Sequence, residues 1–220
     1  MCFLSNMFVP ALSFWQVIVV SIIVLAAGEA KRMGKSKQLL MLDGKPMVWW
    51  TVSKACGSQA AEVVAVLGSY SDQVKQELQG LPVKTVYNPL WGLGQAESVK
   101  AGLRAVRPDA KAVIFLPADQ PLITTALLNQ MIEAYRKGAG SIVVPTCGDR
   151  RSSPVLFGLK WDMEILKIHG DQGAKKLLDR FSEEVAYIPV SDCSLLMDAD
   201  SPEDYRNLQE VWKSRKDETS

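Results

Sequence analysis

Residues 17–37 read VIVVSIIVLAAGEAKRMGKSK, and this stretch decides the fold. Its first part, from Val17 to Val24, is an apolar run rich in β-branched residues, which is typical of a strand buried on both faces. The run ends in Ala26-Ala27-Gly28, small residues that leave backbone N–H groups uncovered. We therefore interpret this stretch as a buried strand that leads directly into a ligand-binding loop.

The loop after this strand is rich in cations. Lys31, Arg32, Lys35 and Lys37 all fall within it. Uncovered N–H groups together with these cations predict a site for a polyanion, most obviously phosphate. The only glycines nearby are Gly28 and Gly34, so the spacing fits neither GxxxxGK[ST] nor GxGxxG.

The composition of the whole chain indicates one large globular domain. The chain has 220 residues, of which 48% are hydrophobic. The 25 Lys and Arg residues balance 24 Asp and Glu residues, so we expect no nucleic-acid partner and only a local anion site. Cysteines occur at 2, 56, 147 and 193 without a CxxC pair, which argues against a zinc site and predicts unpaired thiols in a reducing, cytoplasmic location.

The N-terminal part admits two interpretations. It has no charged residue before Glu29, and the span 7–27 is apolar and long enough to cross a bilayer. However, no basic residue precedes it, Pro10 interrupts it, and its last third is the strand that the loop needs. We therefore expect an apolar extension at 1–16, a single domain at 17–212 and a charged, frayed tail at 213–220. A membrane anchor remains the alternative.

Strand and helix patterns alternate along the rest of the chain. This alternation predicts an α/β fold: a Rossmann-like, doubly wound and mainly parallel sheet with helices on both faces. We expect strands at 62–67, 83–87, 112–116, 141–145, 155–157 and 185–190, and helices at 47–55, 71–78, 98–106, 124–137, 162–167, 173–181 and from 202 onward.

Asp119 follows one of the central apolar runs, in the segment Leu116-Pro117-Ala118-Asp119-Gln120-Pro121. Ligands of doubly wound sheets bind outside the carboxyl ends of the strands, where this carboxylate is expected to lie. Mg²⁺ typically takes one or two carboxylates, together with waters and substrate phosphates. Asp119 is therefore a candidate Mg²⁺ ligand, although a plain turn aspartate before a proline would look the same.

The first loop resembles a known signature. LAAGEAKRMGKSK is similar to LAAGxSxRMGxxK of the MobA-like and MocA-like nucleotidyltransferases, and most of all to the molybdenum cofactor cytidylyltransferases. These enzymes have a fold like that of the nucleotide-diphospho-sugar transferases. The segment NPLWGLGQAES at 88–98 is similar to the family's N-x-x-W-x-x-G-M-x-x-S, with Gln95 in place of methionine. The resemblance implies nucleotide contacts from Leu25, Ala26, Ala27, Gly28, Arg32, Lys37, Gly94 and Ser98.

The same resemblance implies the catalytic and metal-binding residues. Arg32, Lys37 and Asp119 match the family's catalytic positions, and Asp119 would hold Mg²⁺. The segment DADSPEDY at 198–205 is similar to the family's DIDTPEDY, so Asp198 or Asp200 would supply a second metal ligand. Carboxylates also collect at capped helix starts without any metal, which leaves a structural alternative open.

The acceptor side matches the family less well. Gly170-Asp171 and Gly173-Ala174 match GDxGAR, with Lys175 in place of arginine. The family's R-G-H-P is replaced by Arg151-Ser152-Ser153-Pro154, and the serine of LAAGxS is replaced by Ala30. The candidate acceptor-binding residues are Ser152, Ser153, Gly170 and Asp171. His169, the only histidine, is better explained as a turn residue than as a base.

The resemblance implies transfer of a nucleoside monophosphate, with CTP as donor and molybdopterin as acceptor, and release of pyrophosphate. A molybdoenzyme or its maturation factors would be the protein partners, and a membrane partner is not expected. One alternative is a nucleotidyltransferase for a sugar phosphate or an alcohol phosphate. Another is a non-catalytic nucleotide-binding accessory protein, against which the retention of Arg32, Lys37 and Asp119 argues.

Overall fold

The computed structural model describes residues 18–28, 36–171 and 173–219. Its main sheet has eight strands in the order β10-β7-β9-β6-β1-β4-β5, with β8 paired to β7. The strands are β1 (Val20–Ala26), β4 (Glu62–Leu67), β5 (Lys84–Tyr87), β6 (Ala112–Pro117), β7 (Ile142–Cys147), β8 (Arg150–Arg151), β9 (Val155–Gly158) and β10 (Val185–Pro189). A separate hairpin pairs β2 (Met41–Leu42) with β3 (Lys45–Pro46).

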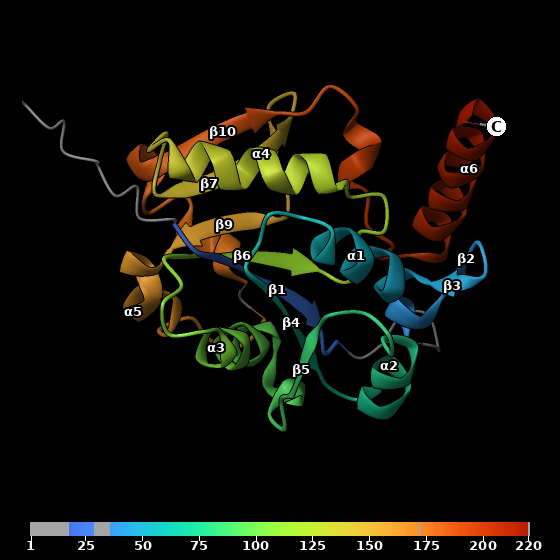
Figure 1. The fold of residues 1–220 in the computed structure, drawn as a ribbon, viewed down its shortest axis with the longest axis horizontal. Coiled ribbons are helices and arrows are strands. Elements are labelled where there is room, and N and C mark those ends of the chain that lie inside the picture. The colour runs from blue at the N-terminus through green and yellow to red at the C-terminus, as the bar shows by residue number, and fades with distance from the viewer. Residues whose placement is uncertain (1–17, 29–35, 172, 220) are drawn as a thin grey trace, which may run out of the picture.

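The described residues form six α-helices, and the C-terminal one stands apart from the sheet, at the right of Figure 1. They are α1 (Met47–Cys56), α2 (Ser71–Glu77), α3 (Gln95–Ala105), α4 (Thr125–Arg136), α5 (Asp162–Ile165) and α6 (Pro202–Thr219). Short 3₁₀ turns complete the described chain at η1 (Lys37–Leu39), η2 (Trp91–Leu93), η3 (Leu159–Trp161), η4 (Ala174–Leu177), η5 (Ser182–Glu184) and η6 (Cys193–Leu196).

Strand β1 is buried on both faces, as its apolar run predicts. Val20, Ile22 and Val24 belong to one core cluster, which also contains side chains of α1, α2 and α4. Ile23 points the other way, into a second cluster with side chains of α3 and α5. Two-sided burial of alternate residues is the property of a doubly wound sheet, so the predicted fold class is confirmed.

The direction of β9 brings Ser152 and Ser153, two candidate acceptor-binding residues, to the carboxyl edge of the central strands. β1 pairs in parallel with β4 and β6, whereas β9 lies antiparallel between β6 and β7. In this register Val155, the first residue of β9, lies opposite Phe115 near the carboxyl end of β6. Residues that precede β9 therefore reach the same sheet edge as the loops that follow β1 and β6.

The C-terminal helix extends further than the sequence indicates. We expect a frayed tail at 213–220, but α6 continues to Thr219. Its buried residue Leu208 joins Leu42 and Met47 in a third cluster, and Lys216 forms an ion pair with Asp43 at 2.7 Å. Contact with the β2–β3 hairpin and α1 thus supports the last turns of this charged helix. Among the helices of the described residues, none is long and apolar enough to span a membrane.

Two further expectations differ from the structure. The helix expected at 173–181 is reduced to η4, although buried Ala174, Leu177 and Leu178 have a spacing that also suits an α-helix. The prediction of unpaired thiols is wrong for Cys147 and Cys193, which form a disulfide with a Cα–Cα distance of 5.4 Å. They lie 46 residues apart, at or just after the ends of the parallel neighbours β7 and β10, so only the fold brings them together.

Candidate functional site

A cavity of about 500 Å³ lies at the carboxyl ends of β1 and β6. This is where the strand order of a doubly wound sheet changes direction and where such sheets bind ligands. Its lining comes from seven separate segments of the chain. The lining residues are Leu25, Ala27, Gly28, Lys37, Gln38, Trp91, Gly92, Gly94, Gln95, Ser98, Pro117, Ala118, Asp119, Ser153, Asp171, Asp198 and Asp200.

The turn after β1 is held by a buried side-chain amide. Nε2 of Gln38 donates hydrogen bonds to the carbonyl oxygens of Ala26 at 3.0 Å and Gly28 at 3.3 Å. Gln38 is 3% exposed, so these bonds are largely shielded from water. The turn is therefore fixed at both ends. Arg32 and the other loop cations up to Lys35 lie outside the described residues.

Lys37 carries the positive charge among the described residues that line this cavity. It lies at the start of η1, and its ammonium group forms ion pairs with Asp119 and, at 2.7 Å, with Asp200. Burial alone would lower the pKa of Lys37, but the two carboxylates outweigh burial and raise it above its ordinary value. Lys37 is therefore a permanent cation at any physiological pH.

Among the described residues, carboxylates outnumber cations around Lys37. Asp119, Asp198 and Asp200 all line the cavity, and the side chain of Asp119 is only 8% exposed. Burial and the neighbouring charges of Asp119 and Asp200 raise the pKa of Asp198 to about 6. Burial and like charge both disfavour the ionised form of Asp198, and a cation bound beside this carboxylate would stabilise that form.

The donor set of this cavity fits a divalent metal that the substrate helps to bind. The described residues contain no preassembled cluster of three His, Cys, Asp or Glu side chains around a single metal position. Asp119 and Asp198 nevertheless lie in one cavity, and Mg²⁺ requires no more than one or two carboxylates when phosphate oxygens and waters supply its other ligands. These two residues would hold the ion.

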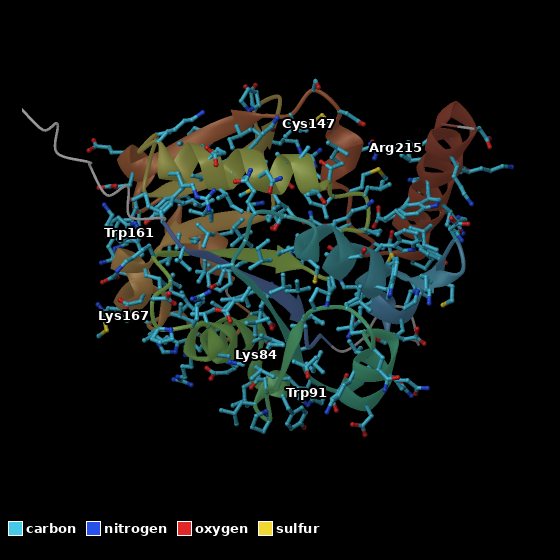
Figure 2. All side chains as sticks on the ribbon, viewed as in Figure 1. Lys84, Trp91, Cys147, Trp161, Lys167 and Arg215 are labelled. Atoms are coloured by element: carbon cyan, nitrogen blue, oxygen red, sulfur yellow. A yellow bond between two sulfur atoms is a disulfide. The ribbon has the colours of Figure 1, made fainter. Side chains whose placement is uncertain are left out.

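The segment between β5 and α3 forms another wall. Trp91 lies on η2, close after β5, and is labelled beside that strand in Figure 2. Asn88 donates a hydrogen bond to the hydroxyl of Ser98 at 3.1 Å, which links the two ends of the segment. Gly94 has φ +115°, and a Cβ there would lie 2.3 Å from the carbonyl carbon of Gly170. Only glycine permits this close approach.

A second cavity of about 400 Å³ adjoins the first. The two cavities share Leu25, Gln95, Pro117, Ser153 and Asp171 in their linings. The remaining residues of the second cavity are Phe115, Arg151, Val155, Gly173, Ala174, Lys175, Lys176 and Asp179. The shared wall makes the two cavities neighbouring halves of one binding region.

The second cavity combines cations with apolar side chains. Arg151 pairs with Asp179 at 2.6 Å, and Nζ of Lys175 donates to the carbonyl oxygen of Arg151 at 2.9 Å. Burial and the nearby charge of Arg151 lower the pKa of Lys175. An anionic group bound between Lys175 and Arg151 would reduce the repulsion between them. Phe115 and Val155 offer apolar surface for the rest of a ligand.

Most of the predicted site residues meet in this region. The structure places Leu25, Ala27, Gly28, Lys37, Gly94, Ser98, Asp119, Ser153, Asp171 and Asp198 in the lining of the first cavity. Ala26, Ser152 and Gly170 line neither cavity. The carbonyl oxygen of Ala26 accepts a hydrogen bond from the side chain of Gln38, and that of Gly170 accepts one from the backbone N–H of Ala96. Exposed His169 also lines neither cavity, in agreement with its interpretation as a turn residue.

Sequence reasoning missed several residues of the region. Gln38 and Gln120 carry no sequence signal, because isolated glutamines next to a motif are common on protein surfaces. Trp91 and Gln95 lie at positions of the family's motif in the segment 88–98, but neither was among the predicted site residues. The cations Arg151, Lys175 and Lys176 gather only through the antiparallel direction of β9 and the turn η4.

Comparison with known proteins identifies a family. The model of the MobA-like NTP transferase domain matches residues 22–185. The bifunctional protein GlmU of Maricaulis maris is 36% identical over 143 residues, which are 63% of this chain but only 30% of that relative. The chain thus spans less than a third of the length of this curated relative.

Two further relatives match over most of their length. The purine catabolism protein PucB of Bacillus subtilis is 27% identical over 194 residues, 83% of this chain and 92% of that protein. The 2-C-methyl-D-erythritol 4-phosphate cytidylyltransferase of Synechocystis is 27% identical over 205 residues, 79% of this chain and 89% of that protein.

Solved structures share the fold. Rv0371c from Mycobacterium tuberculosis is 27% identical with a TM-score of 0.78, covering 87% of this chain and 98% of that one. Its complex with manganese gives a TM-score of 0.73 at the same identity and coverage. The molybdopterin-guanine dinucleotide biosynthesis protein A of Archaeoglobus fulgidus has a TM-score of 0.69 over 88% of this chain and 99% of that one, and at 19% identity it shows the fold alone.

Proposed function

The chain belongs to the family of MobA-like NTP transferase domains, and on this premise we propose that it is a metal-dependent nucleotidyltransferase. In the proposed reaction, a phosphate oxygen of an acceptor attacks the α-phosphorus of a nucleoside triphosphate. The bond from that phosphorus to the bridging oxygen of the leaving group breaks, and pyrophosphate departs. The nucleoside monophosphate is transferred to the acceptor.

One observation carries this proposal. The turn after β1, the segment with Gly94 and Ser98, and the carboxylates Asp119 and Asp198 line the same cavity, beside a second cavity with its own cations. A donor in the first cavity and an acceptor in the second would meet at the shared wall that includes Pro117 and Ser153. Holding two anionic reactants side by side is the main task of such a catalyst.

The residues have separate tasks in this scheme. Backbone N–H groups of the turn after β1 and the ammonium of Lys37 bind the triphosphate, and Arg32 adds charge to the leaving pyrophosphate. Asp119 and Asp198 hold Mg²⁺, which when bound neutralises charge on the phosphates. The segment with Gly94 and Ser98 receives the base. Arg151 and Lys175 bind an anionic group of the acceptor, next to Ser153 and Asp171.

For the substrates we propose CTP as donor and molybdopterin as acceptor. The loop signature supports this choice, because it resembles that of molybdenum cofactor cytidylyltransferases. The cytidylyltransferase relative from Synechocystis supports CTP, and the manganese complex of Rv0371c supports a divalent metal. A flat apolar acceptor with an anionic group would suit the second cavity, where Phe115 and Val155 lie beside Arg151 and Lys175.

A second acceptor class has specific support. Ser152 and Ser153 replace the Gly-His of the R-G-H-P segment, and Ser153 lines both cavities. Serine hydroxyls suit a polyol more than a flat ring, and the Synechocystis relative is named for an alcohol phosphate. An alcohol phosphate or sugar phosphate is therefore the alternative acceptor.

The test is an assay of pyrophosphate release. Purified protein is incubated with Mg²⁺, each of the four NTPs and either molybdopterin or a panel of alcohol and sugar phosphates. We expect pyrophosphate only when CTP, Mg²⁺ and molybdopterin are present together. Release with 2-C-methyl-D-erythritol 4-phosphate instead would establish the alternative acceptor. No release from any pair, with the nucleotide bound, would favour a non-catalytic accessory protein.

A further inference from the structure

Gln120 follows the candidate metal ligand Asp119 and is fully buried. Its Nε2 donates hydrogen bonds to the carbonyl oxygen of Ser153 at 3.3 Å and to that of Leu196 at 3.1 Å. Both hydrogens of one amide group are therefore used on two segments that lie 43 residues apart in the sequence. A side chain without N–H groups at this position would remove this partner from both carbonyl oxygens, of which that of Leu196 is bonded in a buried setting and that of Ser153 in a partly buried one.

The two segments held by Gln120 both carry site residues. Ser153 itself lines both cavities, and Leu196 precedes Asp198 by two residues. Gln120 thereby connects three elements at one point: the end of β6 with Asp119, the segment before β9, and the segment after η6. This connection lies next to Asp119 in the sequence and two residues before Asp198.

Gln38 makes a matching arrangement on the donor side. It also is a buried glutamine that follows a proposed catalytic residue, Lys37, and its Nε2 also donates to two carbonyl oxygens. These carbonyls belong to Ala26 and Gly28, in the turn that is proposed to bind the triphosphate. Each glutamine is buried and donates two hydrogen bonds from Nε2. Gln38 bonds to the turn after β1, whereas Gln120 bonds to the segments that precede β9 and Asp198.

We propose that Gln38 and Gln120 are positioning residues with separate tasks, Gln38 for the triphosphate turn and Gln120 for the pair of carboxylates with the adjoining acceptor segment. Neither touches the reacting atoms. Gln38 keeps the N–H groups of the turn directed into the first cavity. Gln120 keeps Asp198 and Ser153 at a fixed distance from Asp119. This inference rests on the proposed function, because it assigns the two glutamines to its two substrates.

Methionine is the substitution that tests both residues, because it matches glutamine in length and volume but donates no hydrogen bond. Gln38→Met and Gln120→Met each remove two hydrogen bonds, so a merely structural role predicts that any change in affinity follows the loss of thermal stability and does not differ between ligands. Two affinities are measured for each full-length variant. The affinity for CTP in EDTA is measured by isothermal titration calorimetry, and the affinity for Mn²⁺ alone by electron paramagnetic resonance.

The expected result is a crossed pattern. Gln38→Met weakens CTP binding by about tenfold and changes the affinity for Mn²⁺ less than twofold. Gln120→Met weakens Mn²⁺ binding by about tenfold and changes the affinity for CTP less than twofold. Once an acceptor is known, Gln120→Met also lowers kcat at saturating CTP, while Gln38→Met raises KM for CTP.

Other outcomes separate the two proposals. The positioning assignment is overturned if both variants bind both ligands more weakly in proportion to their loss of thermal stability. It is also overturned if neither variant changes either affinity. In both cases the proposed function stands. If the wild-type protein binds neither CTP nor Mn²⁺, whether each is offered alone or both are offered together, the proposed function falls and this inference falls with it. Should Gln120→Met fail to fold, Gln120→Asn replaces it: the shorter amide reaches one carbonyl only, and an unchanged Mn²⁺ affinity in this variant overturns the assignment.

Discussion

The ammonium group of Lys37 is paired with the buried carboxylate of Asp119, and thus a residue of the first loop contacts the end of the central strand β6. The same ammonium reaches Asp200 at 2.7 Å. In the free protein Lys37 therefore supplies the positive charge that the surrounding carboxylates require. A divalent cation bound to Asp119 would compete with Lys37, and a triphosphate would offer Lys37 new partners.

Asp119→Asn should remove turnover without unfolding the protein. The change keeps the size of the side chain and removes one negative charge from a proposed metal ligand. We expect kcat/KM to fall by about a hundredfold or more, as for other electrostatic groups that act on the transition state. Pyrophosphate release measures the loss, and a thermal melt serves as the control for folding. Near-normal Mg²⁺-dependent turnover would contradict the metal assignment.

Lys37→Ala should show that Lys37 and the proposed metal ion compete for Asp119. Turnover falls, with kcat more affected than KM for CTP, since the leaving pyrophosphate gains charge in the transition state. The affinity of the free protein for Mn²⁺ rises instead, because the competing ammonium is gone. Kinetics and Mn²⁺ titration of the same preparation test both effects. Weaker Mn²⁺ binding in this variant would show that Lys37 and the metal do not compete.

Sequence patterns predicted the parts of the site that single segments encode. Lys37 follows a strand and a glycine turn, and Asp119 ends an apolar run, so each is visible within a dozen residues of sequence. The burial of β1 on both faces was predictable for the same reason, because its apolar run shows no alternation. Local periodicity thus gave the fold class and the carboxyl-end location of the site.

The parts that depend on long-range packing were not predictable. The antiparallel direction of β9 leaves no local signal, yet it brings Ser153 beside Asp119. The disulfide joins two cysteines whose sequence positions resemble those of unpaired thiols. The last turns of α6 are charged like a frayed end, and packing of α6 around Leu208 with the Lys216–Asp43 ion pair supports them. In each case tertiary contact overrides local sequence preference.

Gly94→Ala should destabilise the fold. The residue has φ +115° and ψ 172°, a region that only glycine occupies readily, and the added Cβ would overlap the backbone of Gly170. We expect a loss of about 2 kcal/mol or more in the free energy of unfolding. Gly92→Ala is the matched control for stability, since a Cβ at Gly92 meets no atom within 4 Å. Equal melting temperatures for the two variants would refute the close approach.

Reduction of the Cys147–Cys193 disulfide should lower stability and loosen one side of the site. The bond closes a loop of 46 residues, for which the loop-entropy relation gives a stabilisation of about 4 kcal/mol. The loop begins just before β8 and the segment with Ser153, and it ends at η6, which leads to Asp198. Figure 2 labels Cys147 on the side of the molecule opposite Trp91 in this view, so the nucleotide wall should be less affected.

Denaturant unfolding with and without dithiothreitol measures the loss of stability on reduction. Titrations with Mn²⁺ and with CTP measure how far reduction changes the two binding sites. We expect the reductant to lower the unfolding midpoint of the wild type. We also expect it to weaken the binding of Mn²⁺ more than the binding of CTP. Cys147→Ser should resemble the reduced wild type and no longer respond to dithiothreitol. Cys56→Ser is the matched control, because Cys56 is a free cysteine on α1, and it should respond as the wild type does. An identical midpoint for oxidised and reduced wild type would mean that the two cysteines are not paired in solution.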